Sequence, residues 1–187
     1  MNTILFYTSD HGSHFRTRNA EYKRSCHDAS LHIPLIVKGG CFDGGRRVSS
    51  LVSLIDYAPT LLTCGGVTPP AGMPGIPLQR ILASPEAARR EVFVQISESG
   101  VGRALRTEDW TYAVEGENPE SEAAASVYRE AYLYDLKADP AQHCNLVREP
   151  ALEPVRDALR ARLLASIREA EGTEPSIRPA EEKAGVP

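Results

Sequence analysis

The sequence TILFY at residues 3–7, followed by SDHG at residues 9–12, decides the expected fold. A continuous run of apolar and β-branched residues is typical of a strand buried on both faces, as in a parallel α/β sheet. Ser9, Asp10 and His11 then stand at the C-terminal end of that strand, where ligand sites gather in open α/β sheets. We therefore expect an α/β fold with a candidate site at the end of this strand.

The next residues continue the α/β pattern over a short distance. The segment IPLIV at residues 33–37 predicts a second strand. Asp56 can cap a helix that runs from Tyr57 to about Cys64, where a glycine pair ends it. Most partners of the first strand are missing from this chain, so we expect its apolar faces to be exposed and the chain to associate or dissolve poorly. A domain rarely begins at a buried strand, and we expect further sequence upstream of Met1.

The second half of the sequence has a different character. Four short strand-like runs separated by turns predict an antiparallel meander. These runs are residues 92–96, 103–106, 110–114 and 132–136. Apolar residues at spacings of three and four predict a helix from Ala151 to about Ala170, and Trp110 and Tyr112 are expected to pack the sheet against it. Residues 115–126 are acidic and small and predict a mobile hairpin insertion.

Composition and charge exclude several classes of function. The 187 residues carry a formal net charge of −4, with 42% hydrophobic and 25% charged residues, which is ordinary for a globular protein. Without a basic stripe, nucleic acid is not an expected partner, and no apolar run is long enough to span a bilayer. The first residues lack the apolar segment of a signal peptide, which favours a cytoplasmic location. The four cysteines are scattered without a CxxC pair, which disfavours a disulfide framework or a structural zinc site.

Asp10, His11 and Lys23 are the candidate residues for chemistry. Asp10 offers a carboxylate oxygen and His11 an imidazole nitrogen, both common ligands of divalent metals, and Gly12 permits the sharp turn that lets both converge on one ion. Lys23 could return to the same strand end, where its ammonium group would stabilise charge on an anionic ester or its leaving oxygen. The alternatives are a plain turn capped by Asp10 and a solvated surface lysine.

Several segments, in this order, resemble sulfatases of the alkaline phosphatase superfamily. The first ones are SDHG, EYKRSCHDAS with Lys23, HIPLIVKG and LVSLIDYAPTLL. The C-terminal part agrees, with GRALRT before Trp110 and then LYDL, Asp139-Pro140 and Asn145-Leu146, which is similar to the LYDL…DP…NL ending common in the family. The resemblance covers roughly residues 3–165.

The resemblance implies a fold and a division into domains. Residues 1–90 would be the C-terminal end of a sulfatase-like α/β sandwich domain that carries the catalytic site. Residues 91–171 would be a small antiparallel four-stranded sheet with a packed C-terminal helix. The remaining residues, 172–187, are rich in proline and glutamate and predict a disordered tail.

The resemblance also implies roles for individual residues. Asp10 and His11 would be metal ligands, with His11 standing where many relatives carry Asn, and Lys23 would contact the sulfate and assist departure of the alcohol. The metal of the family is usually Ca2+, but a histidine ligand makes Mn2+ or Zn2+ a fair rival. His32, near the entry to the second strand, is a candidate for substrate binding. The implied substrate is a small-molecule sulfate ester, and the oligomeric state is left open.

The nucleophile of the family is absent from this sequence. Sulfatases use a formylglycine made from Cys or Ser within a C/S-x-P-x-R motif, and no cysteine or serine here is followed by x-Pro-x-Arg. Two ligands alone rarely hold a catalytic ion. We therefore expect this chain to belong to a sulfuric ester hydrolase and to be inactive alone. The alternatives are a phosphodiester or phosphonate monoester hydrolase of the same superfamily, and a non-catalytic remnant.

Three further residues are expected to have ordinary surface roles. His14 follows the metal motif closely, but we expect a loop histidine on the surface. Arg103 and Arg106 could bind an anionic substrate, yet paired arginines on a strand are more often part of a solvated face.

Overall fold

The computed structural model describes residues 3–98, 100–117 and 123–181. The chain forms two compact units, of which the first comprises Met1–His11 and Ile33–Val92, and the second comprises Gly12–His32 and Phe93–Pro187. Residues 12–32, which the sequence places with the first region, therefore pack in the second unit. The reason is that Cys26 in this segment is buried in a cluster with Ala104 and Ala113 of the second unit.

The first unit contains a two-stranded antiparallel sheet of β1 (Leu5–Thr8) and β2 (Leu35–Lys38). Tyr7 pairs with Ile36, and both are 61% exposed, as Leu5 is at 59%. The expectation of a strand buried on both faces in a parallel sheet was therefore wrong for this chain. In the described sheet β1 has a single antiparallel partner. The face with Leu5, Tyr7 and Ile36 is exposed, as expected, whereas Phe6 on the other face packs against Phe42 and Tyr57.

Short helices complete the first unit. They are η1 (Gly40–Phe42), η2 (Leu54–Asp56), α2 (Tyr57–Cys64), α3 (Leu78–Ala83) and η3 (Pro85–Ala87). The predicted bounds of α2 are confirmed, but the carboxylate of Asp56 does not cap it. That buried carboxylate instead accepts hydrogen bonds from the backbone N–H groups of Ser53 at 2.8 Å and Ile76 at 2.7 Å and pairs with Arg89. Asp56 thus fixes the connection around α2.

The second unit is built on a five-stranded sheet in the order β3-β4-β5-β6-β7. Its strands are β3 (Glu91–Ser97), β4 (Val101–Thr107), β5 (Trp110–Gly116), β6 (Val127–Asp135) and β7 (Ser176–Arg178). The pairs of β4 with β5 and of β5 with β6 are antiparallel, as the predicted meander requires.

Strand β7 corrects the expectation of a wholly disordered tail. It runs parallel to β6, with Ile177 opposite Tyr128. The strand forms because Ile177 packs against the core and Arg178 pairs with Glu117 at 2.9 Å. The last six residues of the tail, and residues 118–122 of the expected hairpin insertion, lie outside the described residues.

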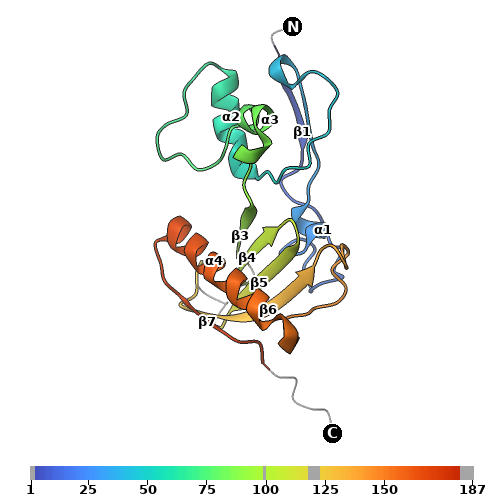
Figure 1. The fold of residues 1–187 in the computed structure, drawn as a ribbon, viewed down its shortest axis with the longest axis vertical. Coiled ribbons are helices and arrows are strands. Elements are labelled where there is room, and N and C mark those ends of the chain that lie inside the picture. Colours follow the sequence, from blue (N-terminus) through green and yellow to red (C-terminus); the bar gives the residue numbers. More distant parts are fainter. Residues whose placement is uncertain (1–2, 99, 118–122, 182–187) are drawn as a thin grey trace. The chain divides into compact units, whose positions relative to one another are not determined.

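Helix α4 (Glu153–Glu171), preceded by η4 (Pro150–Leu152), lies across one face of this sheet (Figure 1). The predicted apolar stripe is confirmed, because Leu159, Leu163 and Ile167 are each at most 3% exposed. These side chains share one core cluster with Tyr112, against which Trp110 also packs, as predicted. The described helices contain no segment long and apolar enough to cross a membrane.

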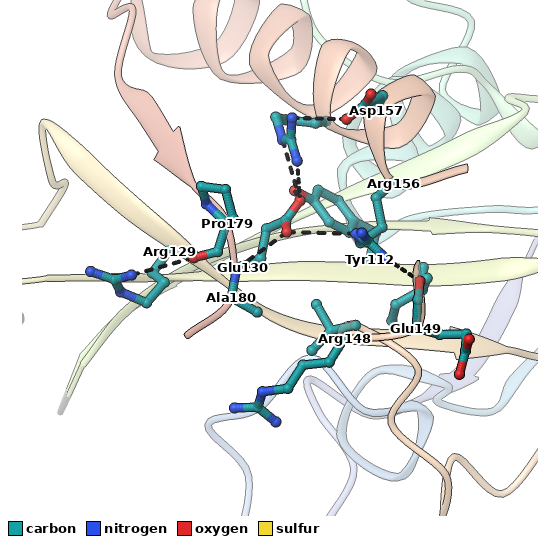
Figure 2. Close-up of polar contacts among 12 residues, drawn as sticks. Tyr112, Arg129, Glu130, Arg148, Glu149, Arg156, Asp157, Pro179 and Ala180 are labelled. Atoms are coloured by element: carbon teal, nitrogen blue, oxygen red, sulfur yellow. Dashed lines mark hydrogen bonds and ion pairs between the residues drawn. The ribbon is translucent and has the colours of Figure 1, made fainter. Parts of the chain in front are cut away.

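A buried carboxylate joins α4 to the sheet. Figure 2 shows Glu130 of β6 beside Tyr112, whose hydroxyl donates a hydrogen bond of 3.0 Å to it. Arg160 of α4 donates to the same carboxylate at 2.6 and 3.2 Å, and Arg156 lies 3.7 Å away. A buried charge is tolerated when it is paired and hydrogen-bonded in this way.

Neither Arg103 nor Arg106 forms a solvated face or a free anion site. Arg103 is 2% exposed, and its Nε lies 2.5 Å from Glu171 at the end of α4. Arg106 forms a two-bond pair with Asp28 at 2.8 and 3.2 Å. The strand pattern alone does not predict this, because each carboxylate partner lies far away in the sequence.

Candidate active site

Asp10 and His11 lie immediately after β1, as the sequence predicts. The Nε2 atom of His11 is 3.5 Å from the Oδ2 atom of Asp10. The Ser9 hydroxyl donates a hydrogen bond of 2.8 Å to the His11 carbonyl, and the His11 N–H lies 3.1 Å from Asp10 Oδ1. These local bonds hold the turn so that a carboxylate oxygen and an imidazole nitrogen face each other.

This pair fits part of a divalent metal site. Metal–ligand distances of about 2.0–2.6 Å allow two donor atoms at this separation to bind one ion. Within the described residues, no group of three or more His, Cys, Asp or Glu side chains is placed to hold a metal. Asp10 and His11 therefore supply two donor atoms to such a site, and any further metal ligands would have to come from other residues.

Gly12 is required where the chain leaves this pair. A Cβ atom at this position would lie 2.2 Å from the Ala29 carbonyl oxygen. Any residue other than glycine would therefore force the backbone to shift. The Gly12 N–H donates a hydrogen bond of 2.8 Å to the Ser30 carbonyl. Glycine is thus needed for a close backbone approach rather than only for flexibility.

Lys23 lies in the loop of the second unit that precedes the short helix α1 (Asp28–Leu31). It is half-buried, and its Nζ atom is 5.6 Å from the centroid of the Tyr22 ring. Asp10 and His11 belong to the first unit, so the grouping of all three residues in one site stays a prediction.

The two other histidines of the sequence prediction have different environments. His32 is exposed at the C-terminal cap of α1, and its substrate role stays a prediction. His14 is only 2% exposed, so the expected surface position was wrong. The loop folds over this ring, with the His14 N–H donating to the Tyr22 carbonyl at 2.8 Å.

Gln142 is a structural residue that the sequence did not reveal. Its side chain is buried, accepts a hydrogen bond from the Asp28 N–H at 2.7 Å and donates to Thr111 at 3.0 Å. Its carbonyl accepts from Arg18 at 2.6 Å, and its φ angle of 57° is rare outside glycine. The only available signal was its place two residues after the Asp-Pro pair. Gln142 fixes both ends of the loop that carries Lys23.

An aromatic cluster buries the same loop against the sheet. The ring of His27 lies 5.1 Å from that of Tyr132 and 5.3 Å from that of Tyr134. Its Nε2 atom is 3.0 Å from the Tyr134 hydroxyl. Burial, and next the charge of Arg18, lowers the pKa of His27 to about 4, so the ring is neutral near pH 7.

Comparison with known proteins decides the family. Residues 20–169, most of the chain, match the family model described as N-sulphoglucosamine sulphohydrolase, C-terminal. The chain belongs to the sulfatase family. The resemblance to sulfatases of the alkaline phosphatase superfamily is thereby confirmed, and the match includes the loop with Lys23.

Individual sulfatases and related structures agree with this family. Arylsulfatase K of Mus musculus is 30% identical over 158 residues, which are 79% of this chain and 27% of that protein. A putative sulfatase of Bacteroides thetaiotaomicron has a TM-score of 0.74 at 25% identity, covering 89% of this chain and 36% of that one. The phosphonate monoester hydrolase of Agrobacterium radiobacter has a TM-score of 0.69 at 25% identity, covering 87% and 34%.

The chain thus spans about a quarter of the length of the sulfatase relative it matches. The mixed α/β fold with a small sheet and a C-terminal helix agrees with the sulfatase structures. None of the cysteines or serines of the sequence stands in a C/S-x-P-x-R motif. The metal ligand pair and the lysine of a sulfatase site are therefore present as candidates without the nucleophile.

Proposed function

We propose that this chain supplies the C-terminal part of the active site of a metal-dependent sulfatase, which hydrolyses sulfate esters of small molecules. The observation that carries the proposal is the pair of Asp10 and His11, whose facing oxygen and nitrogen atoms are 3.5 Å apart directly after β1. The family match adds the general activity, because sulfatases hydrolyse sulfuric esters.

Each candidate residue has a distinct role in this proposal. Asp10 and His11 would hold a divalent cation from one side, and such a cation would supply Lewis-acid polarisation of the ester oxygens. Lys23 places its ammonium group against the sulfate and donates hydrogen bonds to the oxygen of the departing alcohol, which lowers the energy of the developing anion. His32, exposed at the end of α1, contacts the substrate.

The nucleophile must come from another segment. A formylglycine hydrate would attack sulfur, and this chain has no motif from which one is made. With two metal ligands and no nucleophile, the chain is expected to turn over no ester by itself. Activity requires a segment that carries C/S-x-P-x-R and the remaining ligands.

The donor atoms of Asp10 and His11 do not by themselves select one metal among Ca2+, Zn2+ and Mn2+. Ca2+ prefers oxygen ligands and fits Asp10, whereas the imidazole of His11 is a better ligand for Zn2+ or Mn2+. We propose Ca2+, the usual ion of the family, with the other two as rivals.

Hydrolysis of phosphonate monoesters is the second candidate function. The phosphonate monoester hydrolase of Agrobacterium radiobacter matches this chain as well in identity as the putative sulfatase does. Tetrahedral sulfate and phosphonate groups make similar demands on a cation and an ammonium group.

The test begins with the DNA immediately upstream of Met1. An in-phase reading frame with C/S-x-P-x-R is expected, and the extended protein should hydrolyse an aryl sulfate faster than an aryl phosphonate. Lys23→Ala should lower that activity at least about a hundredfold, whereas Lys38→Ala, which removes an exposed lysine of β2, should not. A stop codon upstream would favour a non-catalytic remnant, and faster phosphonate hydrolysis would favour the second candidate.

A further inference from the structure

A cavity of about 410 Å³ lies in the second unit, between the sheet and the loop of residues 18–27. Its floor includes Gly102 and Ala113, which alternate along their strands with the core residues Val101 and Tyr112 that face the helix. Small side chains on the floor leave the space that larger ones would fill. The loop of residues 18–27 forms the opposite wall. The volume is in the range of small-molecule sites.

Most charges around this cavity neutralise one another. Arg24 lies 2.8 Å from Glu21 and 2.5 Å from Glu98, and Arg103 is paired with Glu171. Arg103 and Glu171 cancel, whereas Arg24 lies between two carboxylates, so these pairs leave one negative charge in excess.

Arg18 and Glu115 are the exceptions among the lining residues that the structure describes. The guanidinium of Arg18 donates to two carbonyls, of Ala141 at 2.7 Å and Gln142 at 2.6 Å, and pairs with no described carboxylate. Glu115 is exposed and forms no ion pair with the described cations. Arg18 and Glu115 therefore give the cavity one positive and one negative group that is in no ion pair with a described residue.

The charges of Arg18 and Glu115 both act on Cys26, and the charge of Glu115 also acts on Tyr132. Burial, and next the charge of Glu115, raises the pKa of the Cys26 thiol to about 12, while Arg18 opposes that rise. Burial and then Glu115 also raise the pKa of Tyr132. Arg18 and Glu115 line the cavity themselves, as Cys26 and Tyr132 do.

The buried wall of the cavity also has unsatisfied polar atoms. Nε of Arg24 and Nδ1 of His27 are buried, and no described residue hydrogen-bonds to either. An unsatisfied buried polar atom costs free energy. Because neither atom is accessible to water, both lie behind the lining of the cavity and carry no part of a ligand contact.

We propose that this cavity binds a small zwitterion, with its ammonium group at Glu115, its oxyanion at Arg18 and a short apolar frame over Ala113 and Tyr132. This binding site is separate from the proposed ester hydrolysis. It needs neither the metal nor the missing nucleophile, so its failure would leave the proposed function untouched.

The test uses three probes on the full 187-residue chain. Isothermal titration calorimetry with 6-aminohexanoate is expected to give a Kd of about 1 mM or tighter. Hexylamine lacks the oxyanion and hexanoate lacks the ammonium, so each should bind about tenfold more weakly. The His27 ring resonances should shift at lower concentrations of 6-aminohexanoate than of hexylamine or hexanoate.

Two variants localise the binding. Glu115→Gln keeps the shape of an exposed side chain and removes its negative charge. This substitution should weaken the binding of 6-aminohexanoate about tenfold. Glu108→Gln removes an exposed charge that does not line the cavity and should change nothing. Any one of three results would overturn the proposal. They are no measurable binding of 6-aminohexanoate at millimolar concentration, equal affinity for all three probes, and an unchanged affinity in Glu115→Gln.

Discussion

The Nε2 atom of His27 lies 3.0 Å from the hydroxyl oxygen of Tyr134, and the burial of this ring makes the loop with Lys23 sensitive to acid. Burial, then Arg18 and His14, lowers the pKa of His27 from 6.5 to about 4, and Asp28 opposes them only weakly. The folded state therefore prefers the neutral ring. Stability is fully present above the unfolded pKa of 6.5 and is lost as pH falls toward 4.

We predict that the free energy of unfolding falls by about 2–3 kcal/mol between pH 7 and pH 4 through this group. Urea unfolding across this range measures the slope. His27→Gln should reduce the slope, because glutamine cannot take up the proton. His143→Gln, at an exposed histidine, should keep it, and equal slopes in the two variants would refute the assignment.

The pair of Arg103 and Glu171 is predicted to be a strong structural contact. Both side chains are largely buried, at 2% and 10% exposure. Arg103→Met leaves the carboxylate buried and unpaired, and should destabilise the chain by about 3 kcal/mol. Thermal unfolding measures the effect, and Glu171→Gln added to Arg103→Met should restore part of it.

Arg168→Met provides the control for this pair. Arg168 lies 2.7 Å from Glu174, but both are more than 60% exposed, so the loss should be at most about 0.5 kcal/mol. Similar losses in the two arginine variants would mean that burial does not determine the energy of these pairs.

The sequence predicted local elements well and long-range pairs poorly. The bounds of α2, the stripe of α4 and the meander follow from spacing and turn residues that lie within each element. The partners of Arg103 and Arg106, the burial of His14 and the anchoring by Gln142 depend on segments far apart in the chain. No local pattern distinguishes a buried loop histidine from an exposed one.

The candidate site shows the same difference between local features, which the sequence predicts, and long-range ones, which it does not. Asp10 and His11 are consecutive residues directly after a strand, so the sequence could predict that their side chains lie close together. The cavity beneath the loop depends on Gly102 of β4 and Ala113 of β5 lying on neighbouring strands with a loop above them, and composition alone carries no sign of it.

Glu130 is predicted to be the most sensitive polar residue of the core. Glu130→Gln removes the charge that Arg160 and Arg156 share and should destabilise the chain by about 2–4 kcal/mol. Asp157→Asn breaks a contact of the same Arg160, at 2.9 Å but with Asp157 56% exposed, and should cost about 0.5 kcal/mol or less. Urea unfolding compares the two, and a larger loss for Asp157→Asn would contradict the network in Figure 2.

The exposed apolar face of β1 and β2 is predicted to cause self-association. Leu5 and Ile36 are 59% and 61% exposed, and an apolar strand surface without partners promotes pairing between chains. Leu5→Gln with Ile36→Thr should shift the chain toward monomer in size-exclusion chromatography with light scattering. Leu61→Gln changes an equally exposed leucine, 54%, on α2, and an equal shift in that variant would exclude a specific role of the strands.

His11 is predicted to set the metal preference of the site. The isolated chain offers an imidazole nitrogen and a carboxylate oxygen 3.5 Å apart, and nitrogen ligands favour Zn2+ over Ca2+. His11→Asn exchanges the nitrogen for an amide oxygen, so Zn2+ affinity should fall about tenfold while Ca2+ affinity changes less than about twofold. Titrations followed by NMR at the Asp10 and His11 resonances measure both affinities. His143→Asn should leave both unchanged, and an equal loss of Zn2+ affinity in that variant would show that the ion binds elsewhere.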